Sequence, residues 1–196
     1  VFDKMTCPTL PLHPFPERPS RVNFDEAKLD LQWNYIQIPN ENNYSISERP
    51  GYLRLKGAKE KLSTYGTSTF IGKRVTNLNF TAETKLEFDP AHDNEEAGMI
   101  LLNNGTHFDL MVGKNDGKRY LQVKLQFGSV TYLSKKVFLK AGPVNLRIKG
   151  ETATYSFEYS QDGEEFRQIE KIESRYLSTE TVGGFTGVYI GLYATG

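Results

Sequence analysis

His92 lies in the part of this sequence that is best suited to bind a metal ion. Residues 89–96 bring carboxylates and an imidazole together within eight positions, and His92, Asp93 and Glu95 are the candidate ligands. Hard cations need several oxygen ligands around one point. The stretch lacks the regularly spaced aspartates of a calcium loop, and acidic loops are usually just solvated. We therefore expect no metal and no other cofactor, with these three residues as the candidates to examine.

Residues for nucleophilic catalysis are not recognisable in the sequence. A nucleophile needs a base within hydrogen-bond reach, and no G-x-S-x-G string is present. Cys7 is the only cysteine, so no intrachain disulfide can form, and neither His nor Asp stands beside it. Any two of the 24 acidic residues could meet as a glycosidase pair, but no pair stands out. The sequence predicts no self-sufficient catalytic site.

A glycine-rich stretch near the C-terminal end carries one aromatic residue. Gly183, Gly184, Phe185, Thr186 and Gly187 resemble a phosphate-binding loop in composition. A phosphate loop is followed by a helix N-terminus, whereas residues 188–193 show a strand pattern. Two interpretations of Phe185 remain open: it caps the core, or it projects from a flexible loop into a neighbouring pocket.

The elements that must position these residues are strands, because apolar and polar residues alternate along much of the chain. Side chains alternate between the two faces of a strand, and one buried face with one wet face favours antiparallel sheets. His107 falls on such a strand and is expected to be half exposed. Residues 99–102 are apolar throughout, which predicts a central strand covered on both faces. The alternating runs are residues 81–88, 120–127, 144–148 and 155–159.

Short turn signals separate these runs. Asn104-Gly105, Asp116-Gly117 and Asp162-Gly163 are pairs that tolerate positive φ and favour hairpins. Residues 25–31 could form one turn of helix, with Asp25 as its cap, and no longer helical period is visible. The pattern predicts an all-β protein, an antiparallel two-sheet β-sandwich.

Composition excludes several functional classes. The chain has 196 residues, 38% hydrophobic and 24% charged, which is typical of a globular protein. Lys plus Arg equals Asp plus Glu at 24 each, whereas a nucleic-acid partner would favour a basic excess. No apolar run approaches the roughly 18 residues of a membrane span. We therefore expect neither a nucleic acid nor a membrane as partner.

Prolines divide the chain into two parts. Residues 1–20 hold five of the nine prolines, and proline favours extended backbone and donates no hydrogen bond. This segment is predicted to be a linker from a preceding domain, and residues 21–196 are predicted to be the sandwich. The compartment cannot be predicted, because both bacterial cytoplasm and periplasm or secretion fit a single unpaired cysteine.

Several uncommon strings resemble the C-terminal domain of glycoside hydrolase family 43 β-xylosidases. Residues 44–55, which contain Glu48-Arg49-Pro50-Gly51-Tyr52, resemble the most distinctive of them. The similarity runs in order over roughly residues 21–196. The other matching strings are residues 33–39, 70–74, 80–84, 96–98 and 185–192.

The resemblance implies a concanavalin A-like jelly roll and an absent partner. In this family a five-bladed propeller with the catalytic carboxylates precedes the sandwich on the same polypeptide, and the substrates are short xylooligosaccharides, sometimes with arabinofuranosidase activity. The resemblance also implies that Phe185 forms a hydrophobic wall of the propeller's pocket, supported by Gly183, Gly184, Thr186 and Gly187. Members of the family continue past the string at residues 191–196 into a final strand. Two alternatives follow: a tail beyond Gly196 supplies that strand, or the sheet is completed by other means.

A second hypothesis is an autonomous carbohydrate-binding module for xylan-type glycans. Aromatic residues make up 12% of the chain, and aromatic rings suit the apolar faces of sugars. Aromatic residues are also preferred in strands for structural reasons. Binding of xylooligosaccharides by the chain alone would distinguish this hypothesis from an accessory domain.

Overall fold

The structure is a computed structural model that describes residues 6, 9–11, 13–14, 19–60, 62 and 67–196. The predicted linker, residues 1–20, falls largely on positions outside this set, and so does Cys7.

Strands dominate the described residues, as the period of two predicts. The strands are β1 (Tyr44–Ser45), β2 (Arg54–Leu55), β3 (Thr69–Arg74), β4 (Phe80–Leu86), β5 (Glu96–Asn103), β6 (Thr106–Asn115), β7 (Lys118–Phe127), β8 (Val130–Leu133), β9 (Val137–Phe138), β10 (Val144–Gly150), β11 (Thr154–Ser160), β12 (Arg167–Glu173) and β13 (Tyr189–Thr195). Among these residues the helical elements are short. They are η1 (Glu41–Asn43), η2 (Ser174–Leu177) and α1 (Thr179–Val182).

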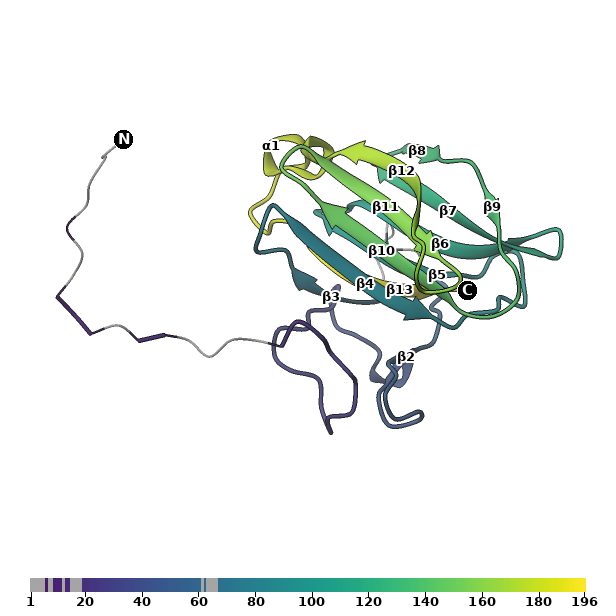
Figure 1. Ribbon diagram of the computed structural model, residues 1–196, viewed down its shortest axis with the longest axis horizontal. Helices are drawn as coiled ribbons and strands as arrows, with labels where there is room; N and C mark the ends of the chain where they lie inside the picture. The colour runs from purple at the N-terminus through teal and green to yellow at the C-terminus, as the bar shows by residue number, and fades with distance from the viewer. Residues whose placement is uncertain (1–5, 7–8, 12, 15–18, 61, 63–66) are drawn as a thin grey trace.

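Two antiparallel sheets lie face to face and form a sandwich (Figure 1). The larger sheet has the strand order β3-β13-β5-β6-β7-β8, with β9 also paired to β7. The smaller sheet has the order β12-β11-β10-β4, and β1 and β2 form a separate ribbon. The predicted all-β, antiparallel two-sheet sandwich is confirmed.

The main core lies between the two sheets. Val144, Leu146 and Ile148 on β10 are fully buried and alternate with partly buried polar residues. They pack in one cluster with Leu101 and Phe108 of the larger sheet. The strand β5 is buried on both faces, as the apolar run at residues 99–102 predicts. Burial of apolar side chains is the dominant favourable contribution to such a fold.

Tight hairpins join β5 to β6 and β6 to β7 at the predicted pairs. Asn104 and Gly105 have φ of 46° and 83°, and Asp116 and Gly117 have φ of 50° and 73°. Positive φ at both central residues is the requirement of the hairpin turn whose twist matches that of the strands. The turn at Asp162-Gly163 likewise falls between β11 and β12. The register between β5, β6 and β7 therefore follows from local turn chemistry.

The single helical turn expected at residues 25–31 is wrong. The backbone there contains bends and the start of a turn but no helix. Residues 31–38 form an isolated bridge between Asn34 and Gly72 and no strand. A cap residue alone does not make a helix, because nucleation fixes several residues for one hydrogen bond. Among the described residues, no helix is long and apolar enough to cross a membrane.

Candidate functional site

The loop that follows α1 displays Phe185 to solvent. The Phe185 side chain has an exposed fraction of 100%, so it does not cap the core of the sandwich. Gly183, Gly184 and Gly187 have φ of 73°, 76° and 73°. Residues with a Cβ rarely adopt this left-handed region. The glycines are therefore what allows the chain to turn sharply around an exposed aromatic residue.

Two asparagines of the β5–β6 hairpin hold this loop in place. Asn103 is buried, and its Nδ2 donates to the Leu177 carbonyl at 2.7 Å. Its Oδ1 accepts from the Thr186 hydroxyl at 3.2 Å. Asn104 Nδ2 donates to the Val182 carbonyl at 2.7 Å. The loop is thus fastened before and after its glycine pair, while Phe185 itself stays uncovered.

Sequence reasoning missed the role of Asn103. Its partners Leu177 and Thr186 lie more than 70 positions further along the chain. The only local signal is the neighbouring Asn104-Gly105 turn, which predicts a hairpin but gives no information on what packs against it. Such a contact depends on the arrangement of the whole sandwich.

In the acidic loop before β5, the carboxylate of Glu95 accepts hydrogen bonds from the backbone of the same loop. Glu95 Oε2 accepts from the backbone N–H groups of Ala91 and His92, at 2.5 and 3.2 Å. These two bonds, from His92 first, hold the pKa of Glu95 below its usual value. Among the described residues, no group of three or more His, Cys, Asp and Glu side chains is arranged to hold a metal ion. His92, Asp93 and Glu95 are therefore not brought together as ligands.

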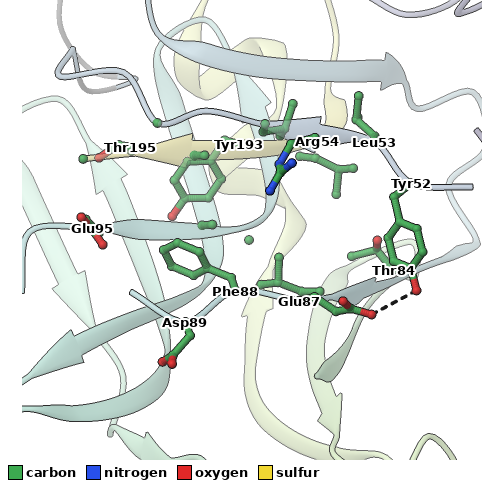
Figure 2. Close-up of a pocket in the computed structure, with 18 of the residues that line it drawn as sticks. Tyr52, Leu53, Arg54, Thr84, Glu87, Phe88, Asp89, Glu95, Tyr193 and Thr195 are labelled. Atoms are coloured by element: carbon green, nitrogen blue, oxygen red, sulfur yellow. Dashed lines mark hydrogen bonds between the residues drawn. The ribbon is translucent and has the colours of Figure 1, made fainter. Parts of the chain in front are cut away.

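A cleft of about 540 Å³ lies beside β4 and the end of β13 (Figure 2). Arg49 Nη1 is 2.6 Å from Glu87 Oε2. The Tyr52 hydroxyl donates to Glu87 Oε1 at 3.0 Å, as the dashed line marks. These two donors, Arg49 first, lower the pKa of Glu87. Within the described residues, β4 is the edge strand of the smaller sheet at this cleft.

Five carboxyl groups among the described residues have a displaced pKa, and none of these five fits the acid of a glycosidase. Such an acid needs a raised pKa, so that it still holds its proton when it meets the substrate. Among the described residues, every carboxyl group whose pKa is displaced has it displaced downward. These groups are Glu87, Glu95, Glu151, Asp162 and Glu180. Hydrogen bonds to these five groups favour their charged forms.

His107 is buried, and its predicted half-exposed state is wrong. Its exposed fraction is 3%, and its Nδ1 lies 2.6 Å from Asp109 Oδ1. Alternation correctly places His107 on the face opposite Phe108, but that face of the larger sheet is covered in part. Periodicity indicates which side a residue faces and does not report whether that side is exposed to solvent.

Comparison with known proteins agrees with this fold. Residues 21–196 match the model of the family described as the beta xylosidase C-terminal concanavalin A-like domain. The chain is 36% identical over 198 residues to a non-reducing end alpha-L-arabinofuranosidase of Bacteroides ovatus, and 36% identical over 200 residues to a xylan 1,3-beta-xylosidase of a Vibrio species. These alignments cover 100% and 97% of the chain but only 37% of each relative.

Solved structures give the same result. The Bacteroides ovatus xyloglucan PUL GH43B superposes with a TM-score of 0.91 at 35% identity, over 96% of this chain and 38% of that one. A xylan beta-1,4-xylosidase of Bacillus halodurans gives a TM-score of 0.88 at 28% identity, over 96% and 38%. The chain therefore belongs to the family of concanavalin A-like C-terminal domains of glycoside hydrolase family 43 β-xylosidases. It spans little more than a third of the length of these relatives.

Proposed function

We propose that this chain is the accessory sandwich of a β-xylosidase-type glycosidase, and that it closes the pocket of a catalytic propeller on the same polypeptide. The observation that carries the proposal is Phe185, fully exposed on a loop that is held by Asn103 and Asn104. The much greater length of the relatives supports a preceding catalytic domain.

Phe185 would act as an apolar wall for the terminal sugar of a xylooligosaccharide. An aromatic ring offers a flat apolar surface, against which the C–H face of a pyranose can pack. Such a wall at the end of the pocket would restrict the enzyme to chain ends, and it would take no part in proton transfer. A large apolar side chain held outward on an anchored loop is typical of an interface anchor.

The test uses the enzyme that contains both this chain and its catalytic domain. Phe185→Ala is expected to lower kcat/KM for xylobiose by about tenfold or more, because a buried aromatic anchor commonly contributes over 1 kcal/mol. Phe185→Tyr keeps the ring and should remain close to the unmodified enzyme. Steady-state kinetics on xylobiose is the measurement.

Phe138→Ala is the matched control for this experiment. Phe138 on β9 is also an exposed phenylalanine, with an exposed fraction of 61%, and β9 lies at the end of the sandwich opposite α1 in Figure 1. Phe138→Ala should leave kcat/KM for xylobiose unchanged. An unchanged kcat/KM in Phe185→Ala would show that this residue does not contribute to the pocket.

A further inference from the structure

A chain of charged side chains crosses the outer face of the larger sheet, the face turned away from the smaller sheet. Glu96 Oε2 lies 2.7 Å from Lys124 Nζ, and Lys124 Nζ lies 3.2 Å from Asp109 Oδ2. The other carboxylate oxygen of Asp109 is the one that meets His107 Nδ1. The Asp109 and His107 side chains have exposed fractions of 0% and 4%. Three neighbouring strands, β5, β6 and β7, therefore place one continuous network on this face.

Burial of this network needs an explanation. An outer sheet face can be left to water, and removing charged groups from water costs several kcal/mol per ion before their attraction is counted. Burial by itself lowers the pKa of Lys124, but the carboxylates of Asp109 and Glu96 more than offset this effect, so its pKa is raised. The ammonium group is thus held in its charged form between two carboxylates.

Nε2 of His107 is buried and has no hydrogen-bond partner among the described residues. The hydroxyl of Tyr193 is buried beside the carboxylate of Asp109. The Tyr193 side chain has an exposed fraction of 1%, and burial, with the charge of Asp109 next, raises the pKa of its hydroxyl well above the usual value. Leaving a buried polar group unsatisfied is unfavourable, because its bonds to water are lost without replacement. Both atoms belong to side chains that line the same cavity.

The cavity has a volume of about 300 Å³. A water molecule occupies about 30 Å³, so the space is roughly ten times too large for one bridging water. It lies at the lower end of the size range of small-molecule sites, about 300–1,000 Å³. Tyr120, Tyr193 and Met111 give it apolar walls, and Gln122, His107 and Lys124 give it polar groups. The exposed side chains of Thr131 and Leu133 lie at its margin.

The chemistry of the lining selects among ligand classes. A metal ion is disfavoured because the Lys124 ammonium already occupies the position between the two carboxylates. An anion is disfavoured because two carboxylates accompany one lysine. A neutral ligand with many hydroxyl groups fits, because each hydroxyl both donates and accepts hydrogen bonds, and aromatic rings pack against its C–H faces.

We propose that this cavity binds one or two sugar units, so that the sandwich has a glycan-binding site of its own. His107 Nε2 and the Tyr193 hydroxyl bond to sugar hydroxyls, and the tyrosine rings contact the apolar face of the sugar. Asp109 acts as a positioning residue, because its carboxylate fixes the orientation of the His107 ring. This assignment gives the hypothesis of a carbohydrate-binding module a specific place in the fold.

The experiment titrates the 196-residue chain with xylose, arabinose and xylobiose and follows the His107 ring by NMR. The chain has three histidines, so the ring signals can be assigned with one His→Gln variant each. The His107 signals are expected to shift and to saturate with a Kd of about 10 mM or tighter for at least one sugar. The signals of His13 and His92 should not move.

Tyr193→Phe tests the assigned contact, because it removes only the hydroxyl and keeps the ring. It is expected to weaken binding by about tenfold. Tyr176→Phe is the matched control, since Tyr176 is an exposed tyrosine on η2. The affinity of this variant for the sugar should equal that of the unmodified chain.

The proposal is overturned if no sugar, at concentrations up to about 50 mM, shifts the His107 ring signals. It is also overturned if Tyr193→Phe binds the sugar as well as the unmodified chain does. Either result is independent of the Phe185→Ala kinetics, because binding is measured without catalysis.

Discussion

Asn103 connects the hairpin of the larger sheet to the loop that carries Phe185. Its amide group bonds to Leu177 on one side and to Thr186 on the other. Asn103→Ala is therefore expected to lower the free energy of unfolding by about 1–3 kcal/mol, because the buried carbonyl of Leu177 is left unsatisfied. It should also speed hydrogen exchange at residues 183–187. Denaturant titration and exchange mass spectrometry measure the two effects.

Asn42→Ala provides the comparison for this variant. Asn42 is exposed on η1, so its replacement should change stability by less than about 0.5 kcal/mol. Exchange in the Phe185 loop that is equally slow in both variants would show that Asn103 does not hold the loop.

Single residues also show where sequence reasoning stops. The face of His107 followed from alternation, but its burial and its contact with Asp109 did not. Alternation does not predict the ion pair between Lys124 and Glu96, because the pair joins strands that are separate in sequence. Phe185 was recognisable because its glycines mark a loop locally. Residues defined by backbone geometry were predictable, and residues defined by cross-strand contacts were not.

At the scale of elements, the turn between β11 and β12 depends on Asp162. Its Oδ1 accepts from the Ser160 hydroxyl at 2.6 Å and from the backbone N–H groups of Glu164 and Glu165. These bonds, Ser160 first, lower the pKa of Asp162 to about 2. A carboxyl group whose pKa is lowered on folding stabilises the protein above its unfolded pKa of about 4, and this contribution is lost as the pH falls toward about 2.

The pH dependence can be measured directly at this carboxyl group. Its NMR titration should have a midpoint of about 2, and Ser160→Ala should move the midpoint upward because the first cause is removed. Below pH 4, the unmodified chain should lose stability relative to Asp162→Asn. A midpoint close to 3.8, the ordinary value, would contradict the hydrogen-bonded turn.

The elements themselves were largely predictable from sequence. The strands β4, β7, β10 and β11 match the alternating runs, because one buried face imposes a period of two. The hairpins match the Asn-Gly and Asp-Gly pairs, because positive φ is a local requirement. The helical turn near Asp25 failed because the segment there is ordered by other contacts, for example Phe24 against Trp33, with ring centroids 6.1 Å apart.

At the scale of the whole molecule, two sheets support two candidate surfaces. One is the Phe185 loop next to α1, and the other is the cavity over β5, β6 and β7. Sequence gave the sandwich and its family resemblance, because several uncommon strings recur in order. It could not place the outer-face network, because that network depends on the pairing of β5, β6 and β7 and on the residues that cover them.

The measurement that tests the proposed role of the sandwich most directly is substrate protection at position 185. In the enzyme with its catalytic domain, Phe185→Cys places a single thiol at the loop tip, and alkylation is followed by mass spectrometry with Cys7 as the internal reference. If Phe185 forms a wall of the sugar pocket, saturating xylose should slow alkylation at position 185 several-fold and leave the rate at Cys7 unchanged. An alkylation rate at position 185 that is the same with and without xylose would contradict the account.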